Sequence, residues 1–157
     1  MDKNESKRKD RSVPFEQNVL KLTHNLTLLA DDVYKANAEK GFHDEDRSID
    51  RELMLIIGEL SEGHESIRKG DHRNEQSPLE WMEVLDRISQ TYDPEDTDTF
   101  KAVFESSVKD TFNDELADAV IRILDTCGKR GIDIHRHVQY KLLYNRTRAH
   151  KHGGKKF

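Results

Sequence analysis

Two pairs of acidic residues, each with a three-residue spacing, are the groups in this sequence best suited to chemistry. Glu59 and Glu62 lie in "ELSE", and Glu115 and Asp118 lie in "DELADAVIRILD". Residues three apart share one face of a helix, and both stretches lie among apolar residues. One such pair alone is ordinarily part of a solvent-exposed face. Two apolar helices that each carry a pair point instead to a shared site.

Carboxylates that face one another need a compensating charge or proton. Two like charges about 4 Å apart repel by about 4 kcal/mol at an effective dielectric constant near 20. If the two pairs meet, either some carboxylates take up protons or a cation lies between them. Oxygen ligands favour hard cations, so we expect Mg²⁺, with Mn²⁺ as an alternative. Because Mg²⁺ commonly bridges carboxylates and phosphates, the pattern indicates phosphate chemistry.

Basic residues near the C-terminus supply the opposite charge. Residues 141–157 contain six Lys or Arg and no acid, whereas residues 90–118 contain nine acids and two basic side chains. The basic segment either binds the phosphates of a nucleotide or is a solubilising or RNA-contacting tail. Its basic residues are Lys141, Arg146, Arg148, Lys151, Lys155 and Lys156.

Helices are the elements that must position these groups. The sequence has three prolines and eight glycines, and nearly every long segment has the helical period. The first two expected helices run from about residue 15 to 40 and from about 49 to 69. A third begins at Pro78, where Ser77 and Glu80 are expected to form a capping box. A fourth begins near Asp98, bends before Phe112 and continues through "DELADAVIRILD", and the last starts after Asp133 and runs through Tyr144. Glycine-containing segments end three of them, the last being the two-glycine break "CGKRGID".

The same period predicts which side chains are buried. The expected inner positions are Val19, Leu22, Leu26, Leu29 and Val33 in the first helix and Leu79, Met82, Leu85 and Ile88 in the third. Short connections favour an all-α helical bundle. The second helix, with "LMLII", is apolar on too many sides for a thin monomeric bundle, so we expect a homodimer or homotetramer.

Composition places the chain among single-domain globular proteins. We expect a disordered leader over residues 1–14, one domain over 15–145 with an inserted segment at about 71–107, and a basic tail over 146–157. No apolar run approaches the roughly 20 residues that span a bilayer, and the leader lacks the apolar core of a signal peptide. The lone Cys127 is expected to be buried and suits the reducing cytoplasm.

The two acidic motifs resemble the ExxE…ExxD signature of the MazG-like nucleotide pyrophosphohydrolases, the all-α NTP pyrophosphatases. "ANAEKGFHDEDRSIDRELMLIIGELSEGHESIRKG" is similar to the first two helices of that family, and "KDTFNDELADAVIRILDTCGKRGIDI" to its central helix. "KLLYNRTRAHKHGGKKF" resembles the C-terminal end of small members. The resemblance covers about residues 15–70 and 108–157. The 52 residues between Glu62 and Glu115 exceed the family's usual separation and include an extra helical segment.

This resemblance implies a Mg²⁺-dependent enzyme that cleaves nucleoside triphosphates between the α- and β-phosphates. It implies an all-α bundle that dimerises, sometimes into tetramers. It also implies that the metal ligands are the acids of the two motifs, which fall on Glu59, Glu62, Glu115 and Asp118.

Our hypothesis is therefore metal-assisted hydrolysis of a triphosphate, in which one of the four acids acts as general base. Lys141, Asn145 and Arg148 are the candidates for contacts to phosphate or sugar, and the first two share a helix face. Arg122, four residues after Asp118, is expected to orient the acids. The alternative is a non-catalytic interaction protein that binds nucleic acid or a partner through its basic tail. The four acids favour the enzyme, with a nucleotide rather than nucleic acid as its partner.

Overall fold

The computed structural model describes residues 25–148, and every regular element in that part of the chain is helical, which confirms the all-α prediction. The elements are α2 (Leu26–Glu39), α3 (Ile49–Arg68), a short 3-10 helix η1 (His72–Glu75), α4 (Pro78–Ser89), α5 (Asp98–Ser107), α6 (Phe112–Arg130) and α7 (Ile134–Thr147). The predicted leader, the expected helix start near residue 15, the positions Val19 and Leu22 and the tail after residue 148 lie outside the described residues.

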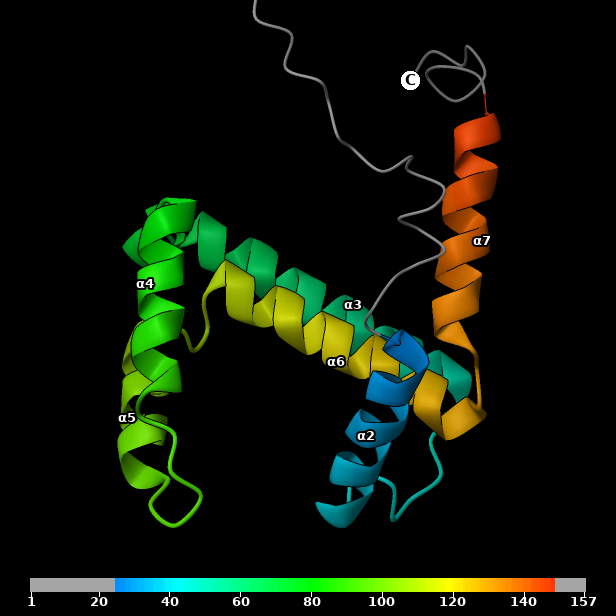
Figure 1. The fold of residues 1–157 in the computed structure, drawn as a ribbon, viewed down its shortest axis with the longest axis horizontal. Coiled ribbons are helices and arrows are strands. Elements are labelled where there is room, and N and C mark those ends of the chain that lie inside the picture. The colour runs from blue at the N-terminus through cyan, green and yellow to red at the C-terminus, as the bar shows by residue number, and fades with distance from the viewer. Residues whose placement is uncertain (1–24, 149–157) are drawn as a thin grey trace, which may run out of the picture.

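An antiparallel pair of helices, α3 and α6, forms the centre of the structure (Figure 1). Helix α2 packs across α6 near one end of the pair, and α4 and α5 stand side by side across the other end. Helix α7 extends away from the end near α2 (Figure 1). The segment predicted as an insertion thus forms a separate hairpin. None of the described helices combines the length and the apolar character needed to cross a membrane.

A chain of hydrogen bonds ties the end of α3 to the start of α6. The Ser66 hydroxyl donates to the carbonyl of Asp110 and accepts from the Asn74 side chain, both at 2.9 Å. The Asn74 side-chain oxygen in turn accepts from the backbone amide of Phe112 at 2.8 Å. Fully buried Thr111 caps α6 with its side chain. The bend predicted before Phe112 is therefore a complete break between α5 and α6.

Ion pairs tie the start of α3 to the end of α6. Buried Glu52 accepts from Lys129 at 3.0 Å and from Arg130 at 2.9 Å, and Lys129 also contacts Asp46 at 2.9 Å. Burial disfavours the charged form of Glu52, but hydrogen bonds and charge from the two basic residues more than offset it and lower its pKa. Both ends of the α3–α6 pair are thus held by specific polar contacts, which set its register.

Close packing between α2 and α6 depends on a glycine. The break predicted over "CGKRGID" begins later than expected, because α6 continues through Gly128 to Arg130 and is capped by Gly131, whose φ is 62°. A Cβ atom on Gly128 would lie 2.4 Å from the carbonyl oxygen of Ala30 and 2.7 Å from Cβ of Tyr34. Gly128 therefore lets the two helix backbones approach each other. Around this contact lies the core, in which Cys127 is buried as predicted.

Several predicted inner positions are exposed within one chain. The exposed fractions are 49% for Leu29, 65% for Leu79, 60% for Met82 and 54% for Leu85. The prediction that these side chains are buried is wrong for the single chain, and of the four inner positions of α4 Ile88 alone is buried. The physical reason is that α4 packs mainly against α5, which covers one side of it.

Local signals set most helix ends correctly. Ser77 and Glu80 form the predicted capping box at the start of α4. Asp133 caps α7 by accepting from a backbone amide of its first turn at 3.1 Å. Helix α7 continues to Thr147, three residues beyond the predicted end at Tyr144 and into the segment predicted as a tail.

The two helical glycines Gly128 and Gly58 provide a matched test of the α2–α6 contact. Gly128→Ala should destabilise the protein by about 2 kcal/mol or more, because the new methyl group overlaps the backbone of α2. Gly58→Ala meets no atom within 4 Å and should be neutral or stabilise the protein by up to about 1 kcal/mol. Urea unfolding followed by circular dichroism measures both. Equal stability of the two variants would contradict this view of the packing.

Candidate metal centre

Three of the four predicted acids converge where α3 lies against α6. One side-chain oxygen each from Glu59, Glu115 and Asp118 lies within 4.8 Å of the others. Glu59 and Glu115 are 6% exposed, whereas Asp118 is exposed to solvent. The helices approach closely at Gly63, where a Cβ atom would lie 3.2 Å from Cβ of Glu115. The antiparallel pairing thus brings together acids that are more than 50 residues apart in the sequence.

Burial and nearby acids make the charged forms of Glu115 and Asp118 unfavourable. The pKa of Glu115 is raised to about 7, first by burial and then by the charges of Glu62 and Glu59. The pKa of Asp118 is also raised, again first by burial and then by Asp114 and Glu59. A bound cation would relieve this repulsion and allow all the carboxylates to ionise. The group therefore has the electrostatic character expected of a cation site.

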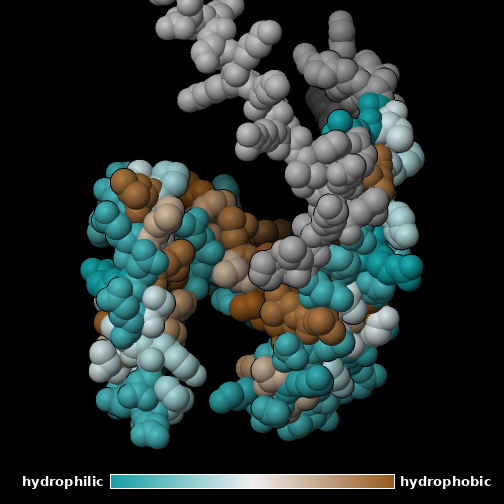
Figure 2. Space-filling view, viewed as in Figure 1, coloured by the Kyte–Doolittle hydropathy of each residue, from teal (hydrophilic) through white to brown (hydrophobic). Residues whose placement is uncertain are grey.

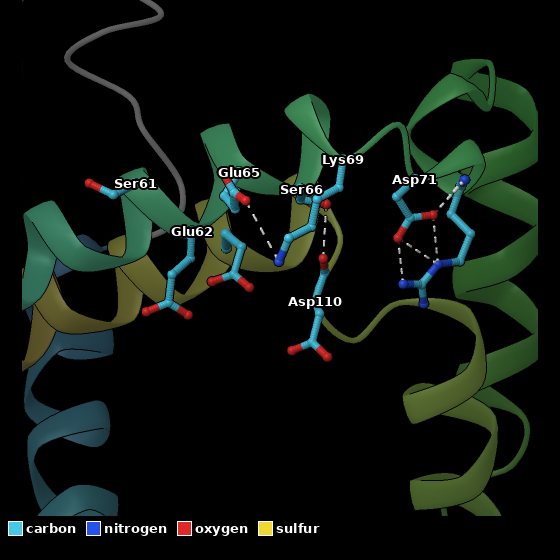
Figure 3. Close-up of a pocket in the computed structure, with 9 residues that line it drawn as sticks. Ser61, Glu62, Glu65, Ser66, Lys69, Asp71 and Asp110 are labelled. Carbon is cyan, nitrogen blue, oxygen red and sulfur yellow. Dashed lines mark hydrogen bonds and ion pairs between the residues drawn. The ribbon is translucent and has the colours of Figure 1, made fainter.

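Glu62, the fourth acid, lies at the edge of the cluster. It is exposed, and it lines a cavity of about 570 Å³ together with Glu115. Figure 3 shows its carboxylate pointing into the same space as that of Asp110, with Asp71 on the far side. Asp71 forms an ion pair with Arg73. Glu62 is thus close enough to affect the pKa of Glu115 and is open to a bound molecule.

Arg122 supports the acids in a different way from the predicted one. Its guanidinium forms an ion pair with Glu59 of the facing helix. Its charge also favours the ionised form of Asp118. The orienting role predicted for Arg122 stays a prediction. The acid that it binds by hydrogen bonding is Glu59 of the other motif, because the side chain reaches across to α3.

A second cavity, of about 430 Å³, lies between α2, α3 and α6 and meets the acidic cluster at Asp118. Arg47 and Arg51, which bring two further positive charges to this cavity, were not among the predicted site residues. Arg47 precedes α3 and Arg51 lies in its first turn, and no sequence pattern reveals what they face. The lining residues are Asn37, Phe42, Arg47, Arg51, Leu55, Asp118, Ile121, Arg122 and Asp125.

The predicted substrate contacts on α7 are not brought to the acids within one chain. Lys141, Asn145 and Arg148 are exposed on a helix that extends away from the α3–α6 pair (Figure 1). The Lys141 amine lies 5.0 Å from the ring centre of Tyr144. It lines a shallow pocket formed by Asp133 and residues of α7, to which none of the four acids contributes. A role for these three residues remains a prediction.

Comparison of the chain with protein-family models, curated proteins and solved structures found no match. The sequence pattern and the geometry of these side chains are therefore what indicate a function.

The raised pKa of Glu115 predicts a pH-dependent stability in the absence of metal. The folded state binds this proton more tightly than the unfolded state, so the stabilising effect is lost as pH rises from about 4.5 to about 7. Glu115→Gln should therefore gain stability over the wild type between pH 5 and pH 8, by up to about 3 kcal/mol. Urea unfolding in EDTA at the two pH values tests this.

Glu83→Gln is a suitable control, because Glu83 is exposed on α4. It should shift stability equally at both pH values. The same result for Glu115→Gln would show that Glu115 does not titrate in the folded protein within this range.

Proposed function

We propose that this chain is a Mg²⁺-dependent nucleoside triphosphate pyrophosphohydrolase of the MazG-like type. It would convert a ribonucleoside or deoxyribonucleoside triphosphate and water into the monophosphate and pyrophosphate. The observation that supports this proposal most strongly is the convergence of Glu59, Glu115 and Asp118, which come from the two motifs on which the sequence hypothesis rests.

The residues at the cluster fit a hard divalent cation. The donors are carboxylate oxygens, which favour Mg²⁺ or Mn²⁺ over softer metals. Glu59, Glu115 and Asp118 would hold the cation, and the raised pKa of Glu115 reflects a negative charge that a cation would offset. When bound, Mg²⁺ would neutralise part of the triphosphate charge and lower the pKa of a water molecule.

The remaining side chains have defined tasks in this proposal. Arg122 holds Glu59 in place through their ion pair. Glu62 lies beside the cluster and opens into a cavity, so its carboxylate is our candidate to accept the proton of the attacking water. The water oxygen would bond to the α-phosphorus as the bond to the bridging oxygen breaks, and pyrophosphate would leave. This assigns one reaction role to each of the four predicted acids.

Conservative variants of the acids test the proposal. Asp118→Asn and Glu59→Gln should each reduce metal-dependent pyrophosphate release at least about 100-fold, because even outer partners of metal ligands are worth 10–100-fold. The assay is a panel of NTPs and dNTPs with Mg²⁺, scored for pyrophosphate and for orthophosphate. Circular dichroism checks that the helices persist, and Glu83→Gln on the exposed face of α4 should retain full activity.

The same assay distinguishes the alternatives. Orthophosphate as the sole product, or unchanged turnover in Asp118→Asn with saturating metal, would contradict the proposal. Salt-sensitive binding of nucleic acid with no response to Mg²⁺ would favour the non-catalytic interaction protein.

We also propose that the functional unit is a homo-oligomer. Hydrophobic residues are visible on the surface around the central helices (Figure 2), and those exposed on α3 include Leu53, Met54, Ile57 and Leu60, each at least 49% exposed. A second copy covering this face of α3 would bury side chains that one chain leaves in water.

A charge on this face should disrupt the assembly. Ile57→Glu and Met54→Glu should each convert an oligomer into monomers, because a carboxylate is costly to bury in an apolar interface. Size-exclusion chromatography with light scattering measures the mass. Lys101→Glu, at an exposed position of α5, should leave the mass unchanged. A wild-type protein that is monomeric at high concentration would contradict this proposal.

A further inference from the structure

The cavity between α2, α3 and α6 combines several arginines with one acid of the candidate metal centre. Arg47, Arg51 and Arg122 line it, and so do the carboxylates of Asp118 and Asp125. Because Asp118 also belongs to the acidic cluster, a molecule in this cavity would lie directly beside a cation held there. The position suits a ligand that must reach the metal.

Two of the arginines in this cavity have no ion-pair partner among residues 25–148. Arg122 is already paired with Glu59, and Asp125 is hydrogen-bonded to His43 at 2.9 Å. The backbone carbonyl of Arg47 accepts a hydrogen bond from Lys129, and the backbone amide of Arg51 donates one to the Ser48 side chain. Neither guanidinium forms an ion pair in the described part of the chain. Two cationic side chains therefore remain available for an anionic ligand.

The cavity next to Glu62 is less suited to an anion. Its two basic side chains, Lys69 and Arg73, are already paired, since Arg73 binds Asp71 through contacts of 2.6–3.1 Å and Lys69 lies 3.9 Å from Glu65. Five acids line the same cavity, namely Glu62, Glu65, Asp71, Asp110 and Glu115. Polyphosphate would be repelled there, so charge favours the cavity lined by the arginines.

We infer that the cavity between α2, α3 and α6 binds the phosphate chain of the nucleotide, with Arg47 and Arg51 as its cationic ligands. This inference rests on the proposed function in taking a nucleoside triphosphate as the ligand. Guanidinium groups bind phosphate oxygens through two parallel hydrogen bonds. The volume of about 430 Å³ lies within the range of small-molecule sites. The proposed phosphate ligands thus come from the connection before α3 and from its first turn.

Inorganic pyrophosphate is the probe that tests this site separately from catalysis. Its affinity is measured by calorimetry with Mg²⁺ on the full-length chain. Arg47→Ala and Arg51→Ala should each weaken binding about 10-fold, as expected for the loss of a charge-assisted hydrogen bond. The KM for a nucleoside triphosphate should rise by a similar factor. The double variant with lysine at both positions should recover part of the affinity, since it keeps both charges.

Arg136→Ala is the matched control, because Arg136 is an exposed arginine on α7 that lines a different pocket. It should leave pyrophosphate affinity unchanged. Three results would each overturn the inference. The Arg47→Ala and Arg51→Ala variants could both keep wild-type affinity for pyrophosphate, or Arg136→Ala could lose as much affinity as they do. The wild type could also fail to bind pyrophosphate.

Hydrolysis of a nucleoside triphosphate by the wild type tests the proposed function independently of this binding site. A wild-type protein that binds pyrophosphate through Arg47 and Arg51 but hydrolyses no triphosphate would support this site and refute the proposed reaction. A wild-type protein that releases pyrophosphate, with unchanged KM and unchanged pyrophosphate affinity in both alanine variants, would refute this site alone.

Discussion

The close antiparallel packing of α3 against α6 is the contact on which the candidate site depends. It places Glu59 opposite Glu115 and Asp118, although the two motifs are far apart in the sequence. Polar contacts at both ends of the pair hold its register, and Gly63 leaves the space for close approach. A shift of one helix by one turn, about 5.4 Å, would separate the carboxylates. The candidate site and the fold therefore depend on the same helix–helix interface.

Packing stabilises this interface, whereas the acids that it buries destabilise it electrostatically. Two buried carboxylates lie in the cluster, and burial with mutual repulsion raises the pKa of Glu115 to about 7. The ion pair between Arg122 and Glu59 offsets part of the charge from the α3 side. Such a group of acids would be removed easily by substitution if stability alone mattered. Its presence at the centre of the structure is more consistent with a functional site than with a structural one.

One chain leaves much of its hydrophobic surface exposed. The hydrophobic core around Ala30, Leu124 and Cys127 is small, whereas α3 and α4 expose large apolar side chains. The α4–α5 hairpin and α2 stand at opposite ends of the central pair, so neither covers the middle of it (Figure 1). The basic residues of α7 likewise lie on a helix that extends away from the α3–α6 pair of the same chain. These features share one explanation if the chain works in an assembly.

Short-range signals in the sequence determined the helical class, the capping box at Ser77 and the pairing of acids on helix faces, because these depend on residues within four positions of one another. Tertiary structure alone decided that Gly128 lies inside a helix, that Arg122 binds Glu59, and that the α4 face is exposed. It also decided that Arg47 and Arg51 line a cavity with Asp118. Each of these depends on contacts between residues distant in sequence, which helical periodicity does not encode.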